Sequence, residues 1–181
     1  ISNTMPTYPS DPGISINREK NINIDNSLVH SFKMGSHTGT HLDVAAHITP
    51  NGKTISDYSL DSFTGVAIKV DKDSFNSLDQ FSNKIDGVLF DSDWYRFFDD
   101  PDKYYGSLRP IIPMKMINKL LKMKIKFFGC DLPSVDVSGI KEKPIHHTLL
   151  DGDIIIYESL TNLNKLPVCT PFQFFGFPLP F

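Results

Sequence analysis

Four short apolar runs constrain the fold of this chain more than any other sequence feature. In the first, Val66, Ile68 and Val70 alternate with polar or small residues, which is the period of a strand. The other three are denser in β-branched and aromatic side chains, and they span residues 87–90, 125–128 and 154–157. Short dense runs of this kind are typical of strands buried inside a sheet. The sequence therefore predicts a substantial sheet.

One segment has the pattern of an amphipathic helix. Pro113 precedes Met114, Ile117 and Leu120, so proline stands at a first helical position and apolar residues recur three or four apart. The prolines at positions 6, 9 and 12 instead predict an extended or turning arm, because each fixes its own φ and disfavours the helical region before it. Residues 73–81 and 91–105 fit short helices or loops equally well. Strands outnumber helices, so we expect a mixed α/β domain.

Composition and charge narrow the class of protein. A length of 181 residues favours one domain, residues 1–181. Hydrophobic residues at 40% and charged residues at 22% are ordinary globular values. The net charge of -3, with no basic stripe, argues against nucleic acid and anionic membranes as partners. There is no apolar stretch near the roughly 20 residues of a membrane span, no secretory signal pattern and no C-x-x-C pair, so we expect a cytoplasmic protein.

Three of the six histidines fall within the eleven residues that run from His37 to His47. On a helix, positions 37 and 41 fall together while 43 and 47 lie roughly on the other side. In an extended chain, however, His37, His41, Asp43 and His47 all occupy odd positions and project to one side. Gly39 allows a tight local turn. We therefore expect a strand-like segment in which these four side chains converge.

Imidazoles and a carboxylate offer mixed nitrogen and oxygen ligands, which suit Zn²⁺ or Mn²⁺ better than Ca²⁺ or Mg²⁺. Each residue taken alone is readily explained as a surface histidine or a turn aspartate. The whole set is better explained by a metal or catalytic site, because such clusters concentrate there.

A second group of polar residues lies about a hundred residues further along. His146 and His147 precede the apolar run at 154–157, and Glu158 ends that run. Burial of an unpaired carboxylate costs several kcal/mol. Glu158 therefore either emerges into solvent at the strand end or meets a cation.

These motifs resemble the cyclase superfamily of metal-dependent hydrolases, whose signature is H-x-G-T-H-x-D-x-P-x-H. Residues 37–47 match it in register, with Ala45 in place of the usual proline. Residues 129–134 are similar to the family's G-x-D-x-x-S stretch, and residues 146–163 to its H-x-x-L-L…E-x-L-x-N-L block. Residues 8–12 are similar to its aromatic-P-G-D-P arm. The resemblance spans most of the chain in the expected order.

The resemblance implies a role for each matching residue. Those that would bind metal are His37, His41, Asp43, His146 and Glu158. His47 would be the proton donor and acceptor, and Tyr8 would line the substrate pocket. His146 is preferred to His147 because the family's twelve-residue step to the glutamate starts at position 146. One or two ions of Zn²⁺ or Mn²⁺ are expected in each subunit.

The resemblance also implies a fold and an assembly. The fold is a swivelling β/β/α domain with a mixed, barrel-like sheet and few helices, and relatives of this kind are homodimers or homotetramers. The last ten residues are strongly aromatic, with phenylalanine at positions 172, 174, 175, 177 and 181. This aromatic end is explained equally well by packing on the core and by a subunit interface.

The expected function is an arylformamidase-like hydrolase that uses metal-activated water to cleave a C–N bond in a small aromatic formamide or cyclic amide. Within the same chemistry, a lactone, an imide or an isatin-type ring is an alternative substrate. The contrasting hypothesis is a non-catalytic module that binds a metal or a small molecule. His47 favours the enzyme, because a binding module has no use for an unligated histidine in a proton-transfer position.

Overall fold

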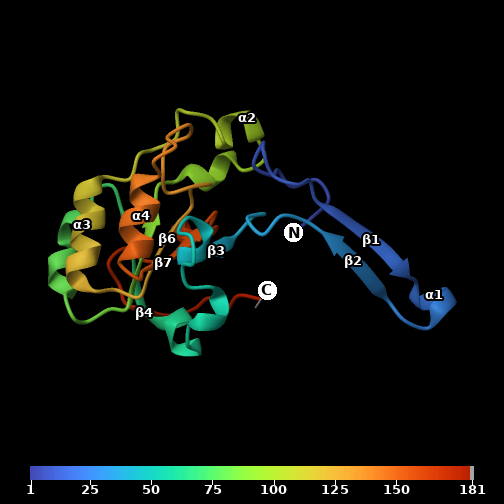
Figure 1. Cartoon of the computed structure of the whole chain (residues 1–181), viewed down its shortest axis with the longest axis horizontal. Helices are drawn as coiled ribbons and strands as arrows, with labels where there is room; N and C mark the ends of the chain where they lie inside the picture. Colours follow the sequence, from blue (N-terminus) through green and yellow to red (C-terminus); the bar gives the residue numbers. More distant parts are fainter. Residues whose placement is uncertain (180–181) are drawn as a thin grey trace.

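A computed structural model describes residues 1–179. It has a six-stranded sheet with two helices packed on one face and a two-stranded hairpin that projects from the other side of the molecule (Figure 1). The sheet order is β3 (His41–Asp43), β7 (Ile155–Glu158), β6 (Phe127–Cys130), β5 (Gly87–Asp91), β4 (Thr64–Asp71) and β8 (Phe172–Phe175). All four apolar runs of the sequence therefore contribute strands to one sheet, as predicted.

The sheet is mixed. The four central strands β4, β5, β6 and β7 are parallel, whereas the outer strands β3 and β8 run antiparallel to their neighbours. The carboxyl ends of parallel strands meet at one edge of a sheet, which is where ligands bind in open α/β sheets. Glu158 ends β7 at this edge, and the β3–β7 register places it directly opposite His41.

The helices are few and short. They are α1 (Ile22–Asp25), α2 (Pro101–Tyr104), α3 (Met114–Met123) and α4 (Pro144–Asp151). Helix α3 confirms the predicted amphipathic helix, because it buries Met116, Ile117 and Leu120 against the sheet and leaves its lysines outside. The two segments that the sequence left open contain short 3₁₀ turns and α2. The mixed α/β class with few helices is confirmed.

The second face of the sheet carries a smaller apolar cluster. Phe127 and Tyr157 lie at its centre, and Phe174 of β8 stacks on Phe127 with ring centroids 4.6 Å apart. Phe172 and Phe174 are half-buried there, whereas Phe175 and Phe177 remain largely exposed. The aromatic end thus partly packs on the core and partly faces outward, and Phe181 lies outside the described residues.

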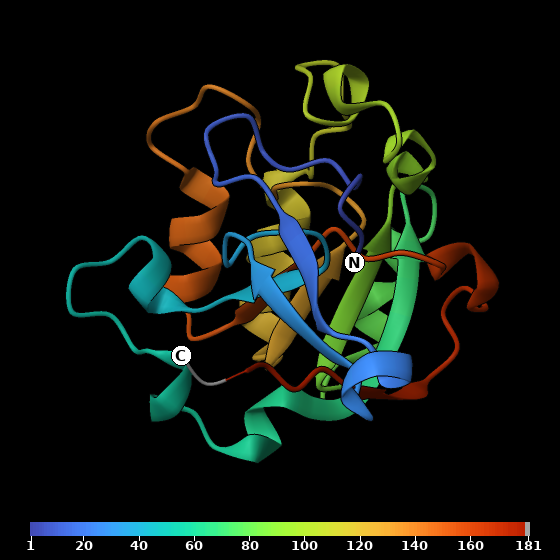
Figure 2. The same cartoon turned by 90° about the vertical axis from the view of Figure 1, so that its right-hand side faces the viewer.

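Strands β1 (Ser15–Lys20) and β2 (Val29–Lys33) form the projecting antiparallel hairpin, with α1 near its tip. Figure 2 views the molecule from the side on which the hairpin projects, with the hairpin in front of the sheet. The segment before it, residues 1–14, has no helix, as the prolines predict. Over residues 1–179, no helix combines the length and the apolar character that crossing a membrane requires.

Candidate metal centre

The segment from His37 to His47 is only partly the extended strand that the sequence predicts. Strand β3 covers three residues, and it directs His41 and Asp43 to one side. His37 lies in the preceding turn, where Gly39 has a φ of +67°, and His47 ends a 3₁₀ turn over Ala45–His47. The alternation of side chains along a strand therefore accounts only for His41 and Asp43. A tight turn on either side brings His37 and His47 to the same place.

Two other elements complete the cluster. Strand β7 carries Glu158, and Oε2 of Glu158 lies 3.4 Å from Nε2 of His41. Helix α4 carries His146, whose Nε2 lies 3.4 Å from Oε1 of Glu158 and 3.5 Å from Oδ2 of Asp43. Nδ1 of His37 lies 3.1 Å from Oδ1 of Asp43. The five predicted metal-binding side chains therefore converge, whereas His147 faces outward beside Asp151.

The donor atoms at the centre are buried and free. Nδ1 of His41 bonds to the carbonyl of Gly39 at 2.8 Å, which leaves Nε2 as the inward atom. Among residues 1–179, neither that Nε2 nor either carboxylate oxygen of Asp43 has a hydrogen-bond partner at a suitable distance and angle, although all three are shielded from solvent. Buried polar atoms without partners are costly and rare. A cation that binds all three removes this cost, so the residues fit a metal ion.

The electrostatics of the cluster reinforce this fit. Burial alone would raise the pKa of Asp43 and of Glu158, but the neighbouring histidines outweigh it and lower both pKa values, so both side chains are carboxylates. Burial alone would lower the pKa of His41, but Glu158 and Asp43 together raise it to about 9. The chain thus gathers two buried negative charges, and without a metal they are balanced by protons on the imidazoles.

His47 has a different environment. Burial lowers its pKa to about 4; Asp43 opposes this change, and His37, Lys143 and His146 add to it. The imidazole is therefore neutral and able to accept a proton at neutral pH. Nε2 of His47 lies 3.2 Å from Nζ of Lys143. Donor atoms of Asp43, His47 and His146 also lie within 4.8 Å of one another, so position alone permits His47 to bind a metal too.

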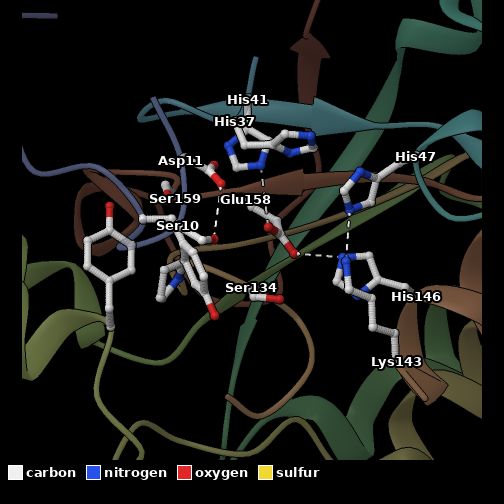
Figure 3. Close-up of a pocket in the computed structure, with 13 residues that line it drawn as sticks. Ser10, Asp11, His37, His41, His47, Ser134, Lys143, His146, Glu158 and Ser159 are labelled. Atoms are coloured by element: carbon white, nitrogen blue, oxygen red, sulfur yellow. Dashed lines mark hydrogen bonds and ion pairs between the residues drawn. The ribbon is translucent and has the colours of Figure 1, made fainter. Parts of the chain in front are cut away.

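A cavity of about 290 Å³ opens over these residues. Figure 3 shows Glu158 near its centre, His47, His146 and Lys143 on one side, and Ser10 and Asp11 from the N-terminal arm on the other. Tyr8 also lines the cavity and meets Tyr105 edge to face, with ring centroids 5.4 Å apart. The structure therefore places Tyr8 in the same pocket as the histidines.

Comparison with known proteins agrees with this arrangement. A family model described as "Putative cyclase" matches residues 1–137, and this range carries the whole histidine motif. The chain belongs to the cyclase family. It is 28% identical over 174 residues to a kynurenine formamidase of Salinibacter ruber, with 92% of this chain and 82% of the relative covered. It is also 28% identical over 170 residues to a kynurenine formamidase of Bacillus cytotoxicus, with 88% and 78% covered.

Solved structures show the same fold as this cyclase-family chain. Isatin hydrolase A from Ralstonia solanacearum superposes with a TM-score of 0.75 at 20% identity, covering 92% of this chain and 78% of that one. A structure described as a potential metal-dependent hydrolase with cyclase activity superposes with a TM-score of 0.69 at 22% identity, covering 97% and 83%. The fold and the family are thus shown together, and the named relatives are hydrolases.

Asp136, which the sequence motifs do not include, holds one of the candidate ligands of this site in place. The carboxylate of buried Asp136 lies 2.7 Å from Nδ1 of His146, within hydrogen-bond distance. It also accepts hydrogen bonds from the backbone N–H groups of Ile145 and His146, at 2.9 and 3.0 Å. Buried Arg109 donates to the carbonyl of Asp136. A carboxylate that holds the outer nitrogen of a metal-binding histidine fixes its tautomer. The available signal was a lone aspartate between Val135 and Val137, ten residues before His146.

Proposed function

We propose that this protein is a metal-dependent hydrolase that cleaves the C–N bond of a small aromatic formamide or cyclic amide. The observation that carries the proposal is the set of buried, unpartnered donor atoms of His41 and Asp43 beside a neutral imidazole, His47, in one cavity. The kynurenine formamidases among its relatives support the formamide, and the isatin hydrolase fold supports the cyclic amide as a second candidate.

Five side chains would hold the ion, and these are His37, His41, Asp43, His146 and Glu158. Their mixed nitrogen and oxygen donors suit Zn²⁺ or Mn²⁺. When bound, such an ion lowers the pKa of its water and polarises a carbonyl group. Glu158 is held in place by the backbone N–H of Val135, which donates to Oε1 at 2.7 Å.

His47 would move the proton. Its pKa, lowered to about 4, keeps the imidazole unprotonated at neutral pH, so its lone pair can accept a proton from the attacking water, whose acidity a bound metal ion would raise. As an imidazolium it then donates that proton to the leaving nitrogen, which departs as a neutral amine. The low pKa makes the imidazolium a strong acid, which favours this second transfer.

Tyr8, Tyr105 and Pro133 form the apolar wall of the cavity. Aromatic rings of a ligand pack favourably against such side chains. The volume of about 290 Å³ limits the ligand to a small molecule. We therefore propose that Tyr8 contacts the ring of the substrate.

A substrate panel tests the proposal. The chain is purified, stripped with a chelator and reloaded with Zn²⁺ or Mn²⁺, and hydrolysis is followed for formanilide, isatin, a lactone and a cyclic imide. We expect metal-dependent turnover of formanilide or of isatin and none by the stripped chain. Equal turnover by stripped and loaded chains would contradict the metal-dependent mechanism. Turnover of the lactone alone would contradict the C–N specificity, and turnover of the imide alone would replace the formamide and the isatin-type ring by an imide as the substrate.

We also propose that the chain forms a homodimer or homotetramer through the hairpin. Ile24 and Phe32 on the hairpin are 80% and 66% exposed, and Leu28 and Val29 of the same hairpin are exposed as well. Covering such apolar side chains with a partner removes them from water and favours association. The segments that flank the hairpin carry Tyr8 and His37 into the cavity, so the projecting arm is continuous with the site. A second copy of this chain is the proposed occupant.

A further inference from the structure

Lys143 stands at the cavity in an unusual backbone conformation. It immediately precedes Pro144 at the start of α4, and its φ and ψ are 39° and 57°. Side chains other than glycine seldom adopt this left-handed region, and a following proline disfavours the helical region as well. Such conformations persist where the surrounding structure fixes them, and they cluster at ligand sites.

The side chain of Lys143 is directed into the cavity. Figure 3 shows it reaching towards His47, and the two nitrogen atoms lie 3.2 Å apart. An ammonium can only donate, so in this contact Nζ of Lys143 is the donor and Nε2 of His47 is the acceptor. An ammonium has three donor hydrogens, so this contact leaves two of them available to a ligand.

The charge of Lys143 has no counterion in the fold. Among residues 1–179, no carboxylate oxygen lies within 4 Å of its Nζ, as is true of most lysines of the chain. It is also the one lysine or arginine among the described residues that line the cavity. Asp11 lines the opposite side of Glu158 in Figure 3. An anionic group in the cavity is therefore attracted to one side and repelled from the other.

We propose that Lys143 is a specificity-determining residue that binds a carboxylate carried by the substrate. This inference rests on the proposed hydrolase and names its substrate class, which is an aromatic amide with an attached anionic group. The ring lies against the wall of Tyr8 and Tyr105, and the carboxylate accepts from Nζ of Lys143.

The test compares a charged substrate with a neutral one. Formanilide and the three formamidobenzoates are assayed with the metal-loaded wild-type chain and with Lys143→Met, Lys143→Arg and Lys141→Met. Lys141 is the matched control, because it is an exposed lysine two residues away that does not line the cavity. The readout is the ratio of kcat/KM for the best formamidobenzoate to kcat/KM for formanilide. Any effect of Lys143 on His47 is shared by both substrates and cancels in this ratio.

We expect Lys143→Met to lower the ratio about 10- to 100-fold, mainly through KM of the charged substrate, which is the range of one charge-assisted hydrogen bond. Lys143→Arg should keep most of the ratio, and Lys141→Met should leave it unchanged. An unaltered ratio in Lys143→Met overturns the proposal. Equal losses on both substrates also overturn it, because they show that Lys143 acts through His47 alone.

A binding measurement separates this inference from the proposed reaction. Benzenesulfonate, whose oxygens are weak metal ligands, and uncharged methyl phenyl sulfone are titrated calorimetrically into the same loaded proteins. We expect the wild-type chain to prefer the anion and Lys143→Met to lose that preference. A wild-type chain that hydrolyses no amide but shows this preference contradicts the proposed reaction and supports the anion site. A chain that hydrolyses formanilide without any preference for anions supports the reaction and contradicts the role of Lys143.

Discussion

Two histidines of this site, His41 and His47, have very different pKa values because their surroundings differ. His41 lies against two carboxylates, which raise its pKa to about 9, whereas burial lowers the pKa of His47 to about 4. The carboxylates that hold a proton on His41 would equally attract a metal cation, which would take the place of that proton. His47 stays neutral and lines the cavity, where we propose that it acts as a base.

Substitution of these two histidines should separate metal binding from proton transfer. His47→Ala should retain the metal and lose about 10²- to 10⁴-fold in kcat, the usual range for a general base. His41→Ala should lose metal and activity together, because it removes a donor atom. The measurements are metal content by mass spectrometry and steady-state kinetics. Equal loss of metal in both variants would show that His47 is itself a ligand, a role that its position permits.

The pH profile supplies a second readout for His47. Its lowered pKa keeps the base form present above about pH 4, so the rate should fall as the pH approaches 4 from above. Protonated imidazole cannot accept the proton of the water, and this limb should disappear in His47→Ala. The comparison uses pH values at which the metal content is unchanged. Full turnover by His47→Ala across this range would assign the proton transfer to another group.

The sequence pointed to the candidate ligands of the site, but not to the residues that hold or contact these ligands. Residues 37–47 were recognisable because the types and spacing of donor residues are themselves the chemical signal. Asp136 and Lys143 gave no such signal, because their roles depend on how one loop folds. Asp136 acts through the outer nitrogen of His146, and Lys143 reaches His47 from 96 positions away in sequence.

At the scale of elements, one loop connects strand β6 to helix α4 and holds two of the five proposed metal-binding side chains in place. The backbone N–H of Val135 holds Glu158, and the carboxylate of Asp136 holds His146. Asp131, at the start of the loop, accepts the backbone N–H groups of Ser92, Trp94 and Tyr95. The loop therefore anchors the site to the structure that follows β5.

Asp136→Asn should weaken metal binding about 10- to 100-fold, the usual effect of removing a partner of a metal-binding histidine. An amide can present its NH₂ group to Nδ1 of His146, which moves the proton to Nε2 and blocks the donor atom. Asp151→Asn, an exposed change on the same helix, is the matched control. Calorimetric titration with Zn²⁺ measures both, and unchanged affinity in Asp136→Asn would exclude the positioning role.

Helices and strands could be predicted from the sequence where the local pattern of apolar residues agrees with the way the segment packs in the fold. The apolar runs became strands β4 to β7, and Pro113 with its spaced apolar residues became α3. Helix α4 was missed because its two histidines and mixed residues show a weaker apolar period, and its burial comes from packing on α3 and β7. The extent of strand β3 was overestimated, because a 3₁₀ turn follows after Asp43.

At the scale of the whole molecule, the hairpin contributes little to the core of its own chain. Its strands and tip expose Ile24, Leu28 and Phe32, and it projects away from the sheet (Figure 1). The proposed assembly covers these side chains with a second copy. No sequence pattern distinguishes such an arm from an ordinary surface hairpin. Only the fold shows that, among residues 1–179, no other segment of the chain covers the apolar side chains of the hairpin.

Sedimentation velocity should show the wild-type chain at two or four times the mass of one subunit. Replacing Ile24 and Phe32 together by serine should dissociate it, because these changes remove apolar area from the proposed interface. Leu108→Ser, which alters a side chain 89% exposed elsewhere on the surface, should leave the assembly intact. A monomeric wild-type chain, or equal dissociation by the control, would contradict the role of the hairpin.

If the proposed site is right, two sequence segments a hundred residues apart bind the same metal ion or pair of ions. Anomalous diffraction at the zinc edge, from crystals grown with Zn²⁺, tests this most directly. We expect one peak, or two closely spaced peaks, about 2.0–2.2 Å from donor atoms of His37, His41, Asp43, His146 and Glu158. A zinc peak bound elsewhere on the chain, with these side chains arranged as they are without it, would show that they do not form the metal site.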